Sequence, residues 1–292
     1  MIYVLYDDPC IDGFGSAFAF WIKYQNSATY LPVNRYKGPF EFPTPLQAED
    51  EIYIIDTSFP RERLLEWKKI CKVVLLDHHK SAQEELGDLD FCHFDMTKSG
   101  CVLAWEYVNK HYTDKNIPIT VPKILLHIQD RDLWRFKLPE TEAITAALFM
   151  KEKDFGIWNN YLWDNFMYTD LLLPGRALIE HKDQYVKERI AEVKLITNSL
   201  GDTVPLINAT IYASELGDAL CKKFPESPYA MIMSVTSLNP LKFKFSLRSR
   251  RVEGADVSKV AAKFGGGGHK EAASFSVSNL NDILKENDSG PR

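Results

Sequence analysis

Three short hydrophobic runs near the beginning of the chain share one arrangement. They occupy residues 2–6, 52–55 and 73–76, and an aspartate follows each of them. Uninterrupted β-rich runs of this length are typical of strands that are buried on both faces of a parallel sheet. Helical patterns lie between the runs, at residues 13–24 and 60–70. This alternation predicts an α/β domain with a parallel sheet and right-handed crossovers.

The rest of the chain has a helical part followed by a second β-containing part. Helical patterns occupy residues 99–106 and 124–134, and residues 175–197 read as one long amphipathic helix. Strand-like segments then return, at residues 209–212, 230–233 and 243–248. We therefore predict two domains, residues 1–197 and residues 203–285. The second is a smaller α/β domain, and the long helix joins the two.

The strand ends carry the residues with the clearest chemistry. Asp56 follows the second run, and the triplet Asp77-His78-His79 follows the third. In a parallel sheet, ligands bind at the carboxyl edge, where such strand ends meet. Imidazole combined with carboxylate suits manganese, zinc or iron, whereas calcium and magnesium prefer oxygen-only ligands. Adjacent surface histidines would explain the triplet by itself, but its place beside other strand-end acids favours a metal site.

Composition and charge narrow the setting and the partners. The chain has 292 residues, of which 45% are hydrophobic and 26% charged, as in soluble globular proteins. No apolar run reaches the roughly 20 residues of a membrane span, and no signal peptide is recognisable. Five cysteines without a CxxC pair indicate a reducing cytoplasm. The net charge of −5 argues against long duplex DNA and favours a short oligonucleotide or nucleotide phosphate as the partner. The sequence is also compatible with a homodimer.

Three further features suggest contacts with a phosphate. Glycines 265–268 precede His269, and such a run lets backbone amides approach an anion, although one glycine also ends a helix. Arg248 ends a predicted strand and could clamp a phosphate with its planar guanidinium. Ser99 lies before a helix, where an anion site and a simple N-cap are equal alternatives.

Taken together, these motifs resemble the DHH phosphoesterase superfamily, which is named for the triplet. Five blocks match in the family's order and span nearly the whole chain. They are residues 12–17 (DGFGSA), Asp56, the triplet, Asp130 within residues 129–134 (QDRDLW), and residues 265–273 (GGGGHKEAA). The last block resembles the substrate-binding domain associated with DHH proteins. The superfamily includes RecJ-type exonucleases, nanoRNases, cyclic-dinucleotide phosphodiesterases and some exopolyphosphatases.

The resemblance implies a set of site residues. The implied metal ligands are Asp8, Asp12, Asp56, His78 and Asp130, with Asp77, His78 and His79 as the catalytic triplet. The implied substrate contacts are His79, Ser99, Arg248, Gly266, Gly267, Gly268 and His269. Asp132 is expected on the helix surface or behind the ligands. The expected cofactor is Mn²⁺, with two ions bound and with Mg²⁺ or Co²⁺ as substitutes.

The first block departs from the family pattern. Where many members have a histidine and two aspartates, this chain has Asp7 or Asp8 in the histidine position and Cys10 in place of the earlier aspartate. Carboxylates replace imidazole as hard ligands, so two metals remain expected. A buried thiol is preferred for Cys10 over a thiolate ligand. The identity of the first metal stays open.

The predicted function is that of a metal-dependent phosphodiesterase that hydrolyses short oligonucleotides to mononucleotides, as nanoRNases do. The enzymatic alternatives are cleavage of cyclic dinucleotides, hydrolysis of nucleotide phosphomonoesters and exopolyphosphatase action. The non-enzymatic alternative is a phosphate-ligand sensor in which the first metal site has degenerated.

Overall fold

The chain divides into two compact units, Met1–Ile179 and Glu180–Arg292. The computed structural model describes residues 1–34, 40–111, 120–162, 168–191, 193–250 and 254–284. The division falls inside a long helix, α9 (Leu173–Ala191). The predicted domain limits, 1–197 and 203–285, put that helix wholly in the first domain and stay a prediction. Residue 285 lies outside the described residues.

The first unit contains a five-stranded sheet. Its strands are β1 (Ile2–Asp7), β2 (Thr29–Val33), β3 (Glu51–Ile55), β4 (Lys72–Asp77) and β5 (Cys92–Phe94). Their order is β2-β1-β3-β4-β5, and every neighbouring pair is parallel. The predicted α/β class is therefore confirmed, and the carboxyl ends of all these strands lie at one edge.

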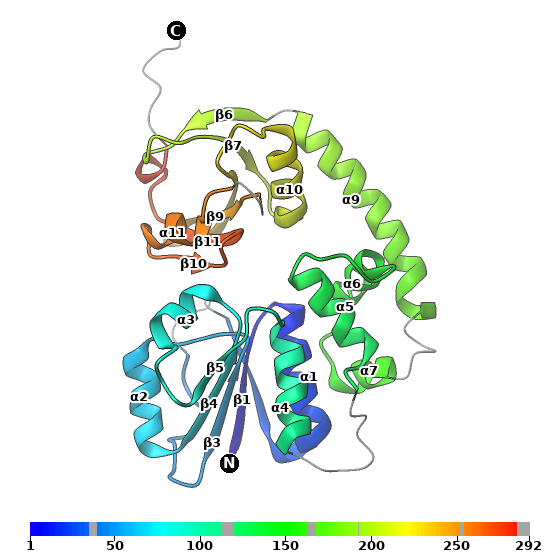
Figure 1. Ribbon diagram of the computed structural model, residues 1–292, viewed down its shortest axis with the longest axis vertical. Helices are drawn as coiled ribbons and strands as arrows, with labels where there is room; N and C mark the ends of the chain where they lie inside the picture. The colour runs from blue at the N-terminus through cyan, green and yellow to red at the C-terminus, as the bar shows by residue number, and fades with distance from the viewer. Residues whose placement is uncertain (35–39, 112–119, 163–167, 192, 251–253, 285–292) are drawn as a thin grey trace, which may run out of the picture. The chain divides into compact units, whose positions relative to one another are not determined.

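Helices cover both faces of this sheet (Figure 1). One face carries α1 (Ile11–Tyr24) and α4 (Gly100–His111), and the other carries α2 (Arg61–Ile70) and α3 (Lys80–Leu86). Successive side chains of a strand point to opposite faces. Thus Val4 belongs to the hydrophobic core under α1 and α4, whereas Leu5 belongs to the core under α2. This two-sided burial explains why the strands are apolar throughout.

A helical region completes the first unit. It consists of a turn after α1, η1 (Gln25–Ser27), then α5 (Lys123–Asp132), α6 (Thr141–Phe149), α7 (Phe155–Asn159), η2 (Asn160–Leu162) and η3 (Tyr168–Leu172). Helix α5 approaches α1 closely at Gly15, where an added Cβ would lie 3.3 Å from Ile128 and 3.5 Å from Leu125. This packing brings the end of α5 to the start of α1.

The second unit has a mixed six-stranded sheet. Its elements are β6 (Lys194–Thr197), β7 (Thr203–Asn208), α10 (Ala213–Lys223), β8 (Ala230–Leu238), β9 (Leu241–Arg248), α11 (Val257–Ala262), β10 (Gly267–Gly268), β11 (Ala272–Val277) and η4 (Leu280–Asp282). The strand order is β10-β11-β9-β8-β7-β6. Only β7 and β8 pair in parallel among these strands. A smaller α/β unit following a long helix is thus confirmed.

Two predicted elements of this part were wrong in their limits. The long helix ends at Ala191, and the last residues of the range predicted as helix form β6 instead. The strand expected at residues 209–212 lies earlier, at β7. Pro205 lacks the N–H of a strand residue and disguised this segment, but Val204 and Ile207 bury their side chains and hold it in the sheet. No helix in the described part of the chain is long and apolar enough to cross a membrane.

Candidate metal centre

His78 lies among three carboxylates at the carboxyl edge of the parallel sheet. Its Nε2 atom is 3.0 Å from Asp56 Oδ1 and 3.6 Å from both Asp12 Oδ2 and Asp132 Oδ2. The imidazole is almost fully buried, with 1% of the side chain exposed. These four residues are called the His78 cluster below. Three carboxylates and one imidazole therefore converge on a common point, where they offer oxygen and nitrogen atoms as possible metal ligands.

Asp56 reaches the cluster through an unusual backbone conformation. It follows β3 directly and has a φ of +58°, in the left-handed region. Among residues other than glycine, aspartate is one of those that adopt this region most readily. The turn leaves the buried carboxylate beside His78. Gly100 makes room for it, because a Cβ at Gly100 would lie 2.6 Å from Asp56 Cβ.

Asp12 is held by the start of α4. Its Oδ2 accepts a hydrogen bond from the Gly100 amide at 2.6 Å, and its Oδ1 accepts one from the Cys101 amide at 3.0 Å. The first amides of a helix lack partners within the helix and favour a negative charge. The carboxylate is fully buried, so its position is set by this helix terminus rather than by solvent.

Asp77 orients the two histidines that follow it. Its Oδ1 accepts hydrogen bonds from the amides of His78 and His79, and it lies 2.6 Å from His79 Nδ1. Burial favours the neutral acid, but the charge and hydrogen bond of His79 prevail and lower the pKa of Asp77 to about 2. The other oxygen, Oδ2, has no hydrogen-bond partner within the described residues. Asp77 is therefore an ionised carboxylate with one donor atom still available.

The placement of Asp8 differs from the sequence-based expectation. Its carboxylate pairs with Lys153 at 2.8 Å instead of facing the other acids. Asp7, the last residue of β1, instead groups with Cys10 and Asp56, with one donor atom of each within 4.8 Å of the others. Strand β1 ends at Asp7, and Asp8 lies in the bend that follows it. The structure thus places Asp7, rather than Asp8, beside Asp56.

Asp130 also lies away from the cluster. Its Oδ1 accepts the Lys137 amide, and its Oδ2 accepts the Leu138 amide and the Thr141 hydroxyl, at 2.7 to 3.0 Å. Asp132, two residues later, is the acid that faces His78. Helical periodicity could have identified it, because Asp132 shares a helix face with Leu125 and Ile128, which pack against α1. The structure thus places Asp132, rather than Asp130, beside His78.

Ser99 is buried behind the start of α4. Its amide donates to Gln129 Oε1 at 3.1 Å, and its hydroxyl lies 3.3 Å from Cys101 Sγ. The helix terminus that follows it already binds an anion, which is the carboxylate of Asp12. The Ser99 hydroxyl thus faces the protein interior.

Arg248 and the glycine run, residues 265–268, lie on either side of strand β11 in the second unit. Arg248 pairs with Ala272 across β9 and β11, and Gly268 pairs with Ala273 across β10 and β11. The Arg248 guanidinium donates to Ser214 Oγ at 2.7 Å. Gly268 has a φ of +141°, which side chains rarely tolerate. The unit thus places a guanidinium on β9 and a glycine-rich strand end followed by His269 at β10, the two strands that flank β11.

Comparisons with known proteins bear on both units. No protein-family model matches the chain. The uncharacterized protein R106 of Acanthamoeba polyphaga mimivirus is 30% identical over 299 residues, covering 96% of this chain and 68% of that protein. The oligoribonuclease NrnB of Bacillus subtilis is 25% identical over 247 residues, covering 78% of this chain and 60% of NrnB. The solved DHH domain of a member of a ribosomal-protein family has a TM-score of 0.57 at 13% identity, covering 97% of this chain and 82% of that one.

The likeness to a solved DHH domain extends over nearly the whole chain, and the triplet lies at the end of β4. The chain thus has the fold of a solved DHH domain.

The electrostatics of the His78 cluster fit a divalent cation. Burial, together with the charge of Asp12, raises the pKa of Asp56 well above its ordinary value, and the same two causes raise the pKa of Asp132 to about 6. Burial alone would lower the pKa of His78, but the hydrogen bond of Asp56 and the charge of Asp132 raise it well above normal. Ionised carboxylates this close repel one another, and a cation among them offsets that repulsion. Carboxylate and imidazole together suit Mn²⁺ and similar transition metals.

Proposed function

We propose that this protein hydrolyses short oligonucleotides to mononucleotides with the help of Mn²⁺. The observation that carries the proposal is the His78 cluster, a group of three carboxylates and one imidazole at the carboxyl edge of the parallel sheet, in which only Asp132 is partly exposed. The relative NrnB, an oligoribonuclease, supports the class of substrate. The chain spans 60% of the length of NrnB, so the oligoribonuclease activity of NrnB is carried over to this chain only as a proposal.

We assign the cation ligands by their placement. Asp12, His78 and Asp132 would hold one ion, and Asp7 would hold a second, with Asp56 between the two groups. Cys10 lies beside Asp7 and Asp56, where its Sγ accepts a hydrogen bond from the Asp12 amide at 3.3 Å. Mg²⁺ and Co²⁺ are expected to substitute for Mn²⁺ with different efficiency, because their preferred ligands differ.

Bound divalent cations supply Lewis acidity toward the phosphate and favour the ionisation of a nearby water. The chain's own residues do the remaining work. Asp77 fixes the orientation of His79, whose half-buried ring is placed to donate a hydrogen bond to a phosphate oxygen. The amides of α4 fix the carboxylate of Asp12. These contacts hold the donors in place before substrate arrives, which lowers the reorganisation needed in the reaction.

The second unit would bind the rest of the substrate. Arg248 offers a planar pair of donors to a phosphate, and the glycine run with His269 offers backbone and ring donors. Ser99 loses this role in the proposal, because its hydroxyl faces Cys101. We further propose a cytoplasmic location, since all five cysteines are free thiols. The net charge of −5 supports short substrates over long duplex DNA.

One experiment separates this function from its alternatives. Purified protein with Mn²⁺ is offered a dinucleotide, a cyclic dinucleotide, a mononucleotide and polyphosphate, and phosphate-ester cleavage is followed by chromatography. The dinucleotide is expected to be hydrolysed with the highest kcat/KM, giving mononucleotides. Faster cleavage of polyphosphate or of the cyclic dinucleotide would replace the proposed substrate. Tight binding of any of these without turnover would indicate a sensor.

A further inference from the structure

Asp130 lies at the centre of a buried hydrogen-bond network near the end of α5. Its side chain accepts hydrogen bonds from the amides of Lys137 and Leu138 and from the Thr141 hydroxyl. Its backbone carbonyl accepts the Arg135 amide at 2.8 Å. One residue therefore binds the segment between α5 and α6, residues 133–140, at several points. This segment is called the Asp130 loop below.

The Asp130 loop has an unfavourable backbone conformation. Trp134, Phe136 and Glu140 have φ values of +53°, +48° and +65°, although none is glycine. Such residues persist only where surrounding contacts determine the conformation, and they cluster at functional sites. Asp130 supplies several of these contacts, through the amides of Arg135, Lys137 and Leu138. Burial disfavours its ionised form, but the Lys137 amide and the Thr141 hydroxyl prevail and lower the pKa of Asp130.

Thr141 extends the network into the first turn of α6. Its Oγ1 donates to Asp130 Oδ2 at 2.7 Å and lies 2.8 Å from His127 Nδ1. All three side chains are buried, with at most 4% of each residue exposed. His127 and Asp130 belong to neighbouring turns of α5, so Thr141 fastens the far end of the loop to the helix from which it departs.

Asp132 occupies the point where this network meets the metal centre. It is the last residue of α5, and the Asp130 loop begins immediately after it. Its side chain, which is 28% exposed, lies 3.6 Å from His78 Nε2. The direction of that carboxylate depends on the conformation of the final turn of α5, which the loop contacts of Asp130 fix.

We propose that Asp130, with Thr141 and His127, is a positioning residue that holds Asp132 on the His78 cluster. The inference rests on the proposed function, in which Asp132 is a cation ligand. Asp130 itself would bind no metal, because its carboxylate faces the Asp130 loop and Thr141, whereas the carboxylate of Asp132 is the one that faces His78. A ligand that is held in place by such outer contacts binds its metal more tightly than one that must be ordered on binding.

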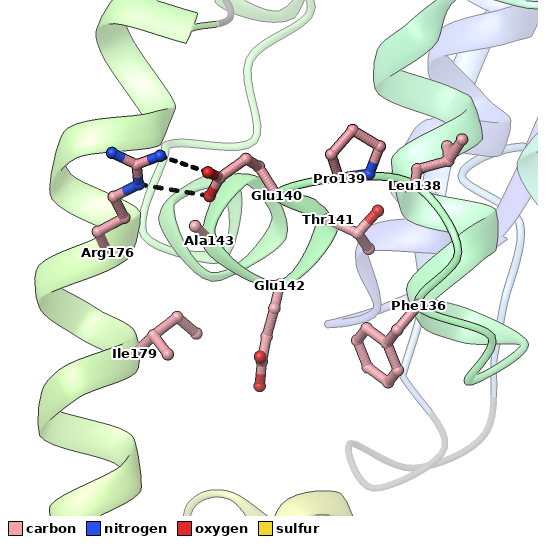
Figure 2. Close-up of a pocket in the computed structure, with 9 residues that line it drawn as sticks. All are labelled: Phe136, Leu138, Pro139, Glu140, Thr141, Glu142, Ala143, Arg176 and Ile179. Atoms are coloured by element: carbon pink, nitrogen blue, oxygen red, sulfur yellow. Dashed lines mark hydrogen bonds and ion pairs between the residues drawn. The ribbon is translucent and has the colours of Figure 1, made fainter.

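The outer side of the same loop supplies a matched control. Phe136, Leu138 and Glu140 line a pocket of about 450 Å³ that α9 closes from the opposite side (Figure 2). There Glu140 forms an ion pair with Arg176. Glu140→Gln thus changes a carboxylate on the loop without touching the buried network. If general loosening of the loop were enough to disturb the metal centre, this variant would do so too.

The test measures Mn²⁺ affinity without substrate, by the electron paramagnetic resonance signal of free Mn²⁺, in Asp130→Asn, Thr141→Val, Thr141→Ser and Glu140→Gln. Asp130→Asn and Thr141→Val are expected to weaken Mn²⁺ binding by about 10- to 100-fold while the number of ions at saturation is unchanged. Thr141→Ser keeps the hydroxyl and should restore near-normal affinity. Glu140→Gln should match the wild type. Circular dichroism establishes that each variant is folded, and the two Thr141 variants carry the test if Asp130→Asn is not.

Each contrary result has a distinct meaning. Wild-type Mn²⁺ affinity in folded Asp130→Asn and Thr141→Val would overturn the positioning role while leaving the hydrolase function intact. Loss of one ion at any concentration in Asp130→Asn, with no effect of Thr141→Val, would make Asp130 a ligand and also overturn it. Mn²⁺ binding by a wild type that cleaves no oligonucleotide would contradict only the proposed function. A wild type that binds no Mn²⁺ would overturn both.

Discussion

The His78 cluster in the first unit and the Arg248 region in the second are built from opposite kinds of chemical groups. The cluster gathers three carboxylates around one imidazole, a set that attracts cations. Arg248 and the glycine run offer a guanidinium and backbone amides, which attract anions. The first is built from side chains at the ends of strands and helices, and the second from one arginine side chain and a glycine-rich backbone. Binding of a phosphate ester and its cations needs both kinds of contact. Substitutions in the first region are therefore expected to change metal affinity, and substitutions in the second to change substrate affinity.

The largest effect is expected from Asp56→Asn, because Asp56 joins both groups of cation ligands. Loss of a contact that supports a metal ligand lowers metal affinity or activity by roughly 10- to 100-fold. Loss of the ligand itself should lower them further. We expect kcat/KM to fall by more than about 100-fold, measured by steady-state hydrolysis of a dinucleotide. Asp95→Asn is the matched control, since Asp95 also follows a strand, β5, but binds Thr97. Equal activities of the two variants would remove Asp56 from the site.

A smaller loss is expected from Gly100→Ala, which leaves every ligand in place. The new methyl group would lie 2.6 Å from Asp56 Cβ, so the start of α4 or Asp56 must move. Overpacking of this kind costs about 1–3 kcal/mol of unfolding free energy. Denaturant unfolding should show this loss, and Mn²⁺ affinity should fall with it. Gly201→Ala is a control for stability alone, because the φ of +89° makes an alanine there strained while nothing lies within 4 Å of the new Cβ. Normal Mn²⁺ binding by Gly100→Ala would show that the site tolerates the shift.

Changes at the Arg248 region should affect substrate affinity and leave metal binding unchanged. Arg248→Lys keeps the charge but loses the planar pair of donors, and we expect KM to rise by about tenfold, or 1.4 kcal/mol. Gly217→Ala should act in the same direction, because its Cβ would lie 2.4 Å from Arg248 Cγ. Kinetics and Mn²⁺ titrations on the same preparations measure both quantities. Weaker Mn²⁺ binding in Arg248→Lys would contradict the division of roles between the two regions.

The smallest effect is expected from Lys153→Ala, which removes the partner of Asp8. The pair is partly exposed, with 27% and 22% of the two side chains accessible, and such pairs contribute about 0–1 kcal/mol. We expect the Mn²⁺ affinity of this variant to differ from that of the wild type by less than about twofold, which corresponds to well below 1 kcal/mol of binding free energy. A tenfold change in affinity would return Asp8 to the metal centre, in place of Asp7.

The parts of the fold that the sequence predicted are those with strong local patterns. Strands β1, β3 and β4 are buried on both faces and are therefore apolar throughout, so Asp56 and the triplet could be placed at strand ends. Strand β2 was missed because it is an edge strand with exposed positions and includes Pro32. Strand β5 has only three residues, too few for a recognisable pattern.

The parts of the site that the sequence did not predict depend on the direction in which a side chain points rather than on its residue type. Asp7 and Asp8 are chemically alike, and only the course of the backbone at the end of β1 decides which one faces Asp56. Asp130 and Asp132 stand two positions apart on a helix and so point about 200° apart. A motif match cannot choose between such neighbours, whereas the packing of Leu125 and Ile128 on α1 does.

The central claim is that a phosphodiester bond is hydrolysed at the His78 cluster with the help of divalent cations. The most direct measurement is the rate of dinucleotide hydrolysis by chelator-treated protein as Mn²⁺ is added back, for the wild type and for His78→Ala. We expect no mononucleotide without metal, saturable recovery of activity with Mn²⁺ in the wild type, and at most marginal recovery in His78→Ala. Hydrolysis by the metal-free wild type, or full recovery in His78→Ala, would contradict the claim.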